Sequence, residues 1–179
     1  MDKNEVKAQV RKMLDAGTAK SDVFARLAGR GVKDSQLAYF IASYADPKRC
    51  YLHDRKVNIL ITIMFVQALI GFLSGVGIGA RMGPDVKWIV GALVASIPLL
   101  LAWGFYKHRV GAYNAYMLLA ILQLPQSFGG FESSPMATLI ALAVNVAVLA
   151  FVWHVRERIF PDFTFIAPKK IRGEYVFSG

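Results

Sequence analysis

Four long stretches without any charged side chain constrain this chain more than any other feature. They cover residues 57–80, 88–106, 110–131 and 133–155. A helix rises about 1.5 Å per residue, so roughly 20 residues match a hydrocarbon core about 30 Å thick. A soluble bundle would give each helix a polar face, and these stretches have none. We therefore expect an all-α membrane protein, built as a four-helix transmembrane bundle over residues 57–158.

The composition supports the same class. Hydrophobic residues make up 55% of the chain and charged residues only 18%. A soluble domain normally has about 45–50% apolar and about 25% charged residues. Both differences are in the direction expected of a membrane protein surrounded by lipid.

The predicted spans differ in how well they suit a membrane. Their approximate limits are residues 57–80, 87–106, 110–128 and 134–155. The first and the fourth are long, and Pro135 suits the first turn of the fourth. Pro98 should kink the second, and Pro125 shortens the third. The number of crossings therefore depends most on the third span, because a three-span chain would place the two ends on opposite sides.

The basic residues predict the orientation. With the N-terminus inside, 19 of the 21 Lys and Arg residues lie on the cytoplasmic side and two lie outside. We therefore expect a multi-pass protein of the cytoplasmic (inner) membrane of a bacterium, with both termini in the cytoplasm. The net charge of +9 then reflects basic flanks beside anionic lipid. Residues 1–56 mix 12 basic with 7 acidic residues, so no nucleic-acid partner is expected.

Residues 1–46 are predicted to form a small cytoplasmic unit of three short helices, followed by a basic linker at residues 47–56. The predicted boundaries are a capping box at Asp2 and Glu5, glycine stops at Gly17 and residues 29–31, a third start near Asp34, and a break at residues 46–47. Forty-six residues make a thin core, so we expect this unit to lean on the bundle or on a partner.

The C-terminal tail, residues 159–179, is predicted to lie on the cytoplasmic side. Aromatic residues alternate with small or polar ones around Phe163 and Phe165, and a turn-rich segment precedes Tyr175. Two structures fit this pattern: a small β-hairpin, or a loosely ordered tail with interfacial aromatic residues.

Small residues recur on one face of the first span. Gly71, Gly75 and Gly79 are four residues apart, the pattern of a glycine zipper, and the fourth span offers Ala141 and Asn145. Such faces let two helices approach closely. The pattern predicts close packing within the chain or an interface with another subunit; lining of a pore is a third outcome.

Two polar residues lie deep within the predicted spans. Gln67 is near the middle of the first span and Asn145 near the middle of the fourth. An amide without a hydrogen-bond partner is costly in hydrocarbon, so both should be buried in the bundle. A Gln67–Asn145 hydrogen bond is the specific prediction, with bonds to the backbone or to another span as the alternative.

The three histidines, His53, His108 and His154, each fall at the cytoplasmic end of a predicted span. If the bundle brought them together, they could bind a metal or relay protons. No two of them are three or four residues apart, so no local ligand pair exists. We therefore expect no metal and no cofactor.

Known catalytic motifs are absent from the sequence: there is no HExxH, CxxC, GxSxG, P-loop or GxGxxG. We expect a non-enzymatic protein that binds a protein partner or a second copy of itself. Examples are an immunity protein against a membrane-active toxin and a subunit of a membrane complex. The alternatives are a small oligomeric channel or permease, with the glycine face at the pore, and an intramembrane enzyme that uses the histidines.

Overall fold

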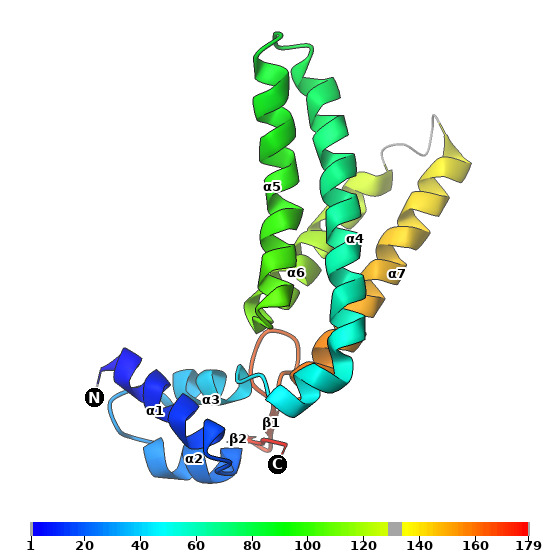
Figure 1. Cartoon of the computed structure of the whole chain (residues 1–179). Coiled ribbons are helices and arrows are strands. Elements are labelled where there is room, and N and C mark those ends of the chain that lie inside the picture. Colours follow the sequence, from blue (N-terminus) through cyan, green and yellow to red (C-terminus); the bar gives the residue numbers. More distant parts are fainter. Residues whose placement is uncertain (1, 129–133, 179) are drawn as a thin grey trace. The chain divides into compact units, whose positions relative to one another are not determined.

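The computed structural model describes residues 2–128 and 134–178, and most of them are helical (Figure 1). The predicted outer loop at residues 129–133 lies outside this part. The chain divides into two compact units, one formed by Met1–Cys50 with Arg156–Gly179 and the other by Tyr51–Val155. The two ends of the chain therefore belong to the same unit.

Three short helices form most of the first unit: α1 (Lys3–Asp15), α2 (Lys20–Leu27) and α3 (Asp34–Ala42). They pack against one another around a small apolar core. That core consists of Val6, Val10, Leu14, Val23, Leu27, Leu37 and Ile41. The three predicted helices are therefore confirmed, and each contributes one apolar face to the core.

The predicted capping box and the two predicted glycine stops in this unit are also confirmed, whereas α3 ends at Ala42, before the predicted break at residues 46–47. The Asp2 side chain caps α1, and the Asp2 N–H donates to Glu5 Oε2 at 3.0 Å, which completes the capping box. Gly17 follows α1 with φ +82°, and Gly29 follows α2 with φ +73°. This left-handed backbone is strained for residues with a side chain, so glycine ends both helices.

The tail contains the smallest element of the fold, an antiparallel hairpin of β1 (Lys170–Ile171) and β2 (Glu174–Tyr175). Arg172 and Gly173 form the turn with φ +54° and +89°, and two successive positive φ angles are typical of the type I′ turn that suits tight hairpins. Of the two structures predicted for the tail, the hairpin is confirmed.

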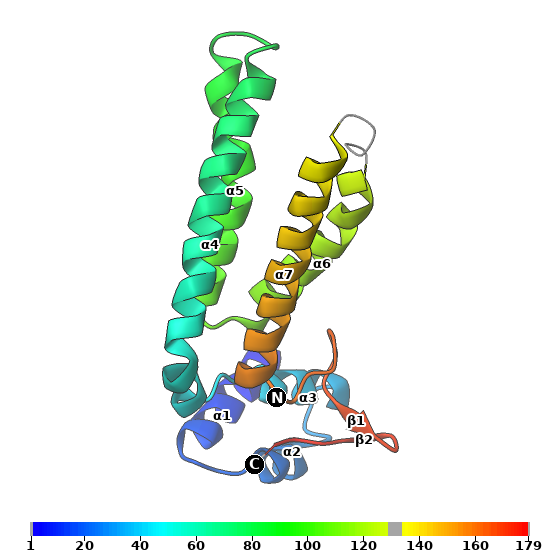
Figure 2. The same ribbon diagram turned by 90° about the vertical axis from the view of Figure 1, so that its right-hand side faces the viewer.

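Long helices dominate the second unit: α4 (Pro47–Gly79), α5 (Val86–Tyr106), α6 (Val110–Ser127) and α7 (Pro135–Ile159), seen from two sides in Figures 1 and 2. Among the described residues, α4, α5 and α7 are long and apolar enough to cross a membrane. The apolar part of α6, Val110–Pro125, is shorter. Pro98 lies inside α5 and does not end it.

The predicted basic linker, residues 47–56, is helical and forms the first turns of α4. Pro47 occupies the first helical position, where its missing N–H leaves no bond unmade. Asp46 precedes it and accepts a hydrogen bond from the Lys48 N–H at 2.9 Å. The break at residues 46–47 is therefore a helix start, and no flexible segment separates it from the first predicted span.

The glycine face of α4 packs against α5 within the chain. A Cβ added at Gly75 would lie 2.8 Å from the Gly91 Cα, and one at Gly79 would lie 2.6 Å from the Lys87 Cα. At Gly71 the nearest atom, Val94 Cγ1, would be 3.2 Å away. The two backbones can approach this closely only because side chains are absent. Of the outcomes predicted for this face, intrachain packing is the one observed.

Helices α5 and α6 also pack together. Gly104 on α5 faces Ala112 so closely that no side chain fits there. The rings of Phe105 and Tyr113 pack nearby at a tilt, with centroids 4.6 Å apart, and both residues are fully buried. The short third apolar helix is therefore joined to the second by a tight, aromatic contact.

Candidate functional site

The three histidines do not gather into one cluster. Within the described residues, no group of three or more His, Cys, Asp or Glu side chains could hold a metal ion. His53 is half-buried on α4, and His154 is exposed on α7. Lys56 Nζ lies 3.0 Å from His154 Nε2. This contact joins α4 to α7.

His108 occupies the connection between α5 and α6 with a φ of +47°, a conformation that non-glycine residues rarely adopt. Burial lowers the pKa of His108, and the carboxylate of Asp54 partly opposes that effect. His108 and Asp54 are therefore within electrostatic reach of each other.

The two deep amides have different surroundings. Gln67 Nε2 donates to the hydroxyl of Tyr116 on α6, with 3.4 Å between the heavy atoms. Asn145, predicted to be buried, is exposed on α7. The predicted Gln67–Asn145 bond therefore does not form in the described structure; the alternative, a bond to another span, is what Gln67 makes.

Helix α7 is the least covered of the long apolar helices. Only 6% of its most apolar segment is buried, against 22% for α4 and 28% for α5. Ala137, Ala141 and Asn145 lie four residues apart on it, and all three are exposed. The small-residue face of α7 is therefore exposed in the described chain, whereas that of α4 packs against α5.

A buried ion pair joins α2 to the tail. Lys20 Nζ lies 2.6 Å from Asp162 Oδ2, and the Lys20 and Asp162 side chains are only 13% and 2% exposed. Asp162 Oδ1 also accepts from the Ser178 N–H at 2.6 Å. One carboxylate thus joins the N-terminal helices to the end of the tail. Sequence reasoning missed this contact, because the paired residues are 142 positions apart.

Arg156 organises the start of the tail. Sequence reasoning treated it only as a basic flank, but it is fully buried. Its Nη1 donates to the Thr164 carbonyl at 3.2 Å and its Nη2 donates to the Phe165 carbonyl. The guanidinium also lies over the Phe163 ring, 5.6 Å from the centroid. Several donors in one rigid fork let this arginine hold the chain as it leaves α7.

Aromatic contacts complete the junction between the tail and the N-terminal helices. The ring of Phe24 on α2 packs at a tilt against the rings of Tyr175 and Phe177, with centroids 5.5 Å and 5.6 Å away. Tyr39 of α3 meets Phe163 edge to face at 5.5 Å. Such pairs add about 0.5–1.5 kcal/mol each beyond the area they bury. The aromatic residues of the tail therefore extend the thin core of the N-terminal unit.

A cleft of about 560 Å³ lies in this unit, beside the end of α1. Lys20, Tyr44 and Ser178 are among the residues that line it. The Tyr44 hydroxyl donates to Asp15 Oδ1 at 2.7 Å across one wall. Burial, followed by the bond to Asp15 and the nearby negative charges, raises the pKa of Tyr44 from 10.0 to about 12.

This shift predicts a loss of stability at alkaline pH. The folded chain holds the Tyr44 proton more tightly than the unfolded chain. The stabilisation of the folded state by the protonated hydroxyl is therefore complete below pH 10 and falls as the pH rises toward about 12. In a phenolate absorbance titration, Tyr44→Phe should remove one transition near pH 12. The free energy of unfolding of this variant should also fall less than that of the parent chain as the pH rises toward 12. An unchanged titration curve in Tyr44→Phe would contradict the assignment.

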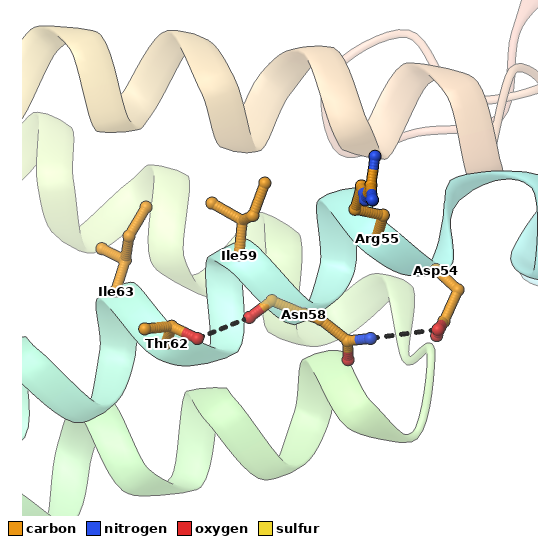
Figure 3. Close-up of a pocket in the computed structure, with 6 residues that line it drawn as sticks. All are labelled: Asp54, Arg55, Asn58, Ile59, Thr62 and Ile63. Atoms are coloured by element: carbon orange, nitrogen blue, oxygen red, sulfur yellow. Dashed lines mark hydrogen bonds between the residues drawn. The ribbon is translucent and has the colours of Figure 1, made fainter.

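A second hollow, a groove of about 530 Å³, lies along α4 (Figure 3). Its lining residues are Asp54, Arg55, Asn58, Ile59, Thr62 and Ile63. All six come from one helix, as three adjacent pairs at successive turns. The first pair is charged, and each of the next two pairs has one polar and one apolar residue.

Comparisons of the chain with protein families, with characterised proteins and with solved structures find no match. The geometry of the described residues is therefore the basis for a functional proposal.

Proposed function

We propose that this chain is a non-enzymatic membrane protein that crosses the bacterial inner membrane four times and binds a protein partner within the bilayer. An immunity protein against a membrane-active toxin and an assembly subunit of a membrane complex are two forms of this role. A second copy of the chain is the other partner that the role allows.

Four crossings are supported by the way in which the chain ends are joined. Both ends belong to one compact unit, in which Lys20 pairs with Asp162. A hydrocarbon core cannot lie between parts of one packed unit, so the segment between them must cross an even number of times. With α4, α5 and α7 as three crossings, α6 is needed as the fourth.

The length of α6 is compatible with this role. Its apolar part, Val110–Pro125, would span about 24 Å at about 1.5 Å per residue. A bilayer can thin locally to meet a short helix at a modest cost. The excess of Lys and Arg in the terminal segments supports a cytoplasmic location for the shared unit.

The exposed Asn145 is the observation that carries partner binding. An amide that faces lipid at mid-span is unfavourable unless a neighbouring helix satisfies it. Ala137 and Ala141 lie on the same side of α7, where small side chains permit a second helix to come close. A partner helix on this face would bury the amide and cover the least buried span.

The test compares two identical substitutions on opposite sides of α7. Ala141 and Ala143 are both exposed, so we expect leucine to be accommodated at either position. We expect Ala141→Leu to lower partner recovery from mild detergent about tenfold, the effect of about 1.4 kcal/mol, and Ala143→Leu to leave it unchanged. Equal recovery from both variants, or the absence of both a heterologous partner and a dimer, would contradict the proposal.

The channel alternative placed the face formed by Gly71, Gly75 and Gly79 at a pore. That face contacts α5 in the chain, so the geometry does not favour a pore there.

A further inference from the structure

The groove on α4 combines charged, polar and apolar side chains in a fixed order. Asp54 and Arg55 stand at one end, just before the first predicted span. Asn58 and Thr62 follow at successive turns, with Ile59 and Ile63 beside them in Figure 3. Along the direction in which α4 would enter the membrane, the lining changes from ionic to apolar within three turns.

The polar residues inside the groove are held by the helix itself. Asn58 Nδ2 donates to Asp54 Oδ2 at 3.0 Å, and Thr62 Oγ1 donates to the Asn58 carbonyl at 3.0 Å (Figure 3). These bonds orient one carboxylate oxygen of Asp54 and leave the other available to a donor. The groove is therefore preorganised along its polar side.

The two charges at the head of the groove are exposed and not used in ion pairs. Asp54 and Arg55 take part in none of the salt bridges in the described residues. Adjacent positions on a helix point in different directions, about 100° apart, so the pair cannot satisfy itself. An acidic and a basic group separated in this way match a ligand that carries both charges.

We propose that this groove binds a zwitterionic glycerophospholipid whose headgroup ends in a primary ammonium. The ammonium donates to the Asp54 carboxylate, the phosphate accepts from the Arg55 guanidinium, and an acyl chain lies along Ile59 and Ile63. A volume of about 530 Å³ accommodates the headgroup and the first part of one chain. The proposal rests on the membrane location given under the proposed function, but not on a protein partner.

Other lipid classes fit the groove less well. A lipid with net negative charge would meet Arg55 favourably and Asp54 unfavourably. A choline headgroup keeps the positive charge but has no N–H to donate to a carboxylate. The charge pattern therefore predicts a preference among lipids that differ only in their headgroup.

The experiment measures the thermal stability of the full chain, delipidated in mild detergent, against added lipid. Three lipids with the same acyl chains are compared: phosphatidylethanolamine, phosphatidylcholine and phosphatidylglycerol. We expect half-maximal stabilisation at about tenfold lower concentration for the ethanolamine lipid, the factor expected for one charge-assisted hydrogen bond. Equal concentrations for all three lipids would overturn the proposal, and this comparison needs no variant.

Two variants then locate the site. Asp54→Asn removes the acceptor charge and is expected to abolish the preference for ethanolamine over choline. Asp85→Asn, the same change at an exposed residue outside the groove, should keep it. A preference that survives Asp54→Asn would place the lipid elsewhere. The two proposals can fail separately. If the chain prefers the ethanolamine lipid but partner recovery does not change in Ala141→Leu, the lipid site is supported and the proposed partner binding is contradicted.

Discussion

Gly75→Ala is expected to lower the free energy of unfolding by about 1–3 kcal/mol, the usual effect of overpacking a close contact. The new Cβ would lie 2.8 Å from the Gly91 Cα and 3.0 Å from the Val90 carbonyl oxygen. Both are backbone atoms, which cannot rotate away, so α4 and α5 must separate. Unfolding of the detergent-solubilised protein by sodium dodecyl sulfate, followed by tryptophan fluorescence, measures the loss.

Gly77→Ala is the matched control on the same helix. An added Cβ at Gly77 meets nothing within 4 Å, so no clash is expected. Alanine also has a better helix propensity than glycine, by up to about 1 kcal/mol. The control should therefore be neutral or slightly stabilising. If both variants lost the same stability, the cause would be general to glycine replacement and not the contact with α5.

Asp162→Ala is expected to release the tail from the N-terminal helices. The substitution leaves the Lys20 ammonium, only 13% exposed, without its carboxylate, and removes the acceptor of the Ser178 N–H. Removing one partner of a buried pair costs about 3–5 kcal/mol, because the remaining charge is uncompensated. Trypsin should then cut at Lys169, Lys170 or Arg172 at least about tenfold faster than in the parent chain, since tail opening becomes more frequent.

Two controls separate the buried pair from charge effects in general. Arg11→Gln disrupts an exposed ion pair, in which the Arg11 side chain is 81% exposed and the Asp15 side chain 55%. This change should alter the free energy of unfolding by at most about 1 kcal/mol. Adding Lys20→Met to Asp162→Ala removes the uncompensated charge and should slow cleavage again. Cleavage of Asp162→Ala at the parent rate would mean that the pair does not hold the tail.

Helix positions could be predicted from the sequence because they depend on near neighbours. The capping box at Asp2 and Glu5 and the stop at Gly17 involve residues within one or two turns, and the structure has both. The apolar stretches similarly predicted where the long helices lie, since their hydropathy is a property of consecutive residues. The limits of these elements differ from prediction mainly at α4, which begins at Pro47.

The partners of the candidate site residues could not be predicted in the same way. Gln67 bonds to Tyr116 and not to Asn145, because the side of α4 that carries Gln67 meets α6. The sequence does not distinguish Arg156 from the other basic residues that flank the spans. In the structure, however, it is buried and donates to carbonyls of the tail. Neither outcome leaves a signal in spacing or hydropathy, because both depend on which helix faces come together.

What the sequence determined by itself is the local order of this chain: three short helices with one apolar face each, long uncharged stretches and a turn-rich tail. Helix formation and hydropathy need only residues that are close along the chain. The tertiary structure decided the rest, above all that Lys20 and Asp162 join the two ends and that the glycines of α4 meet α5. These contacts are set by the shape of packed surfaces, which form only when distant segments meet.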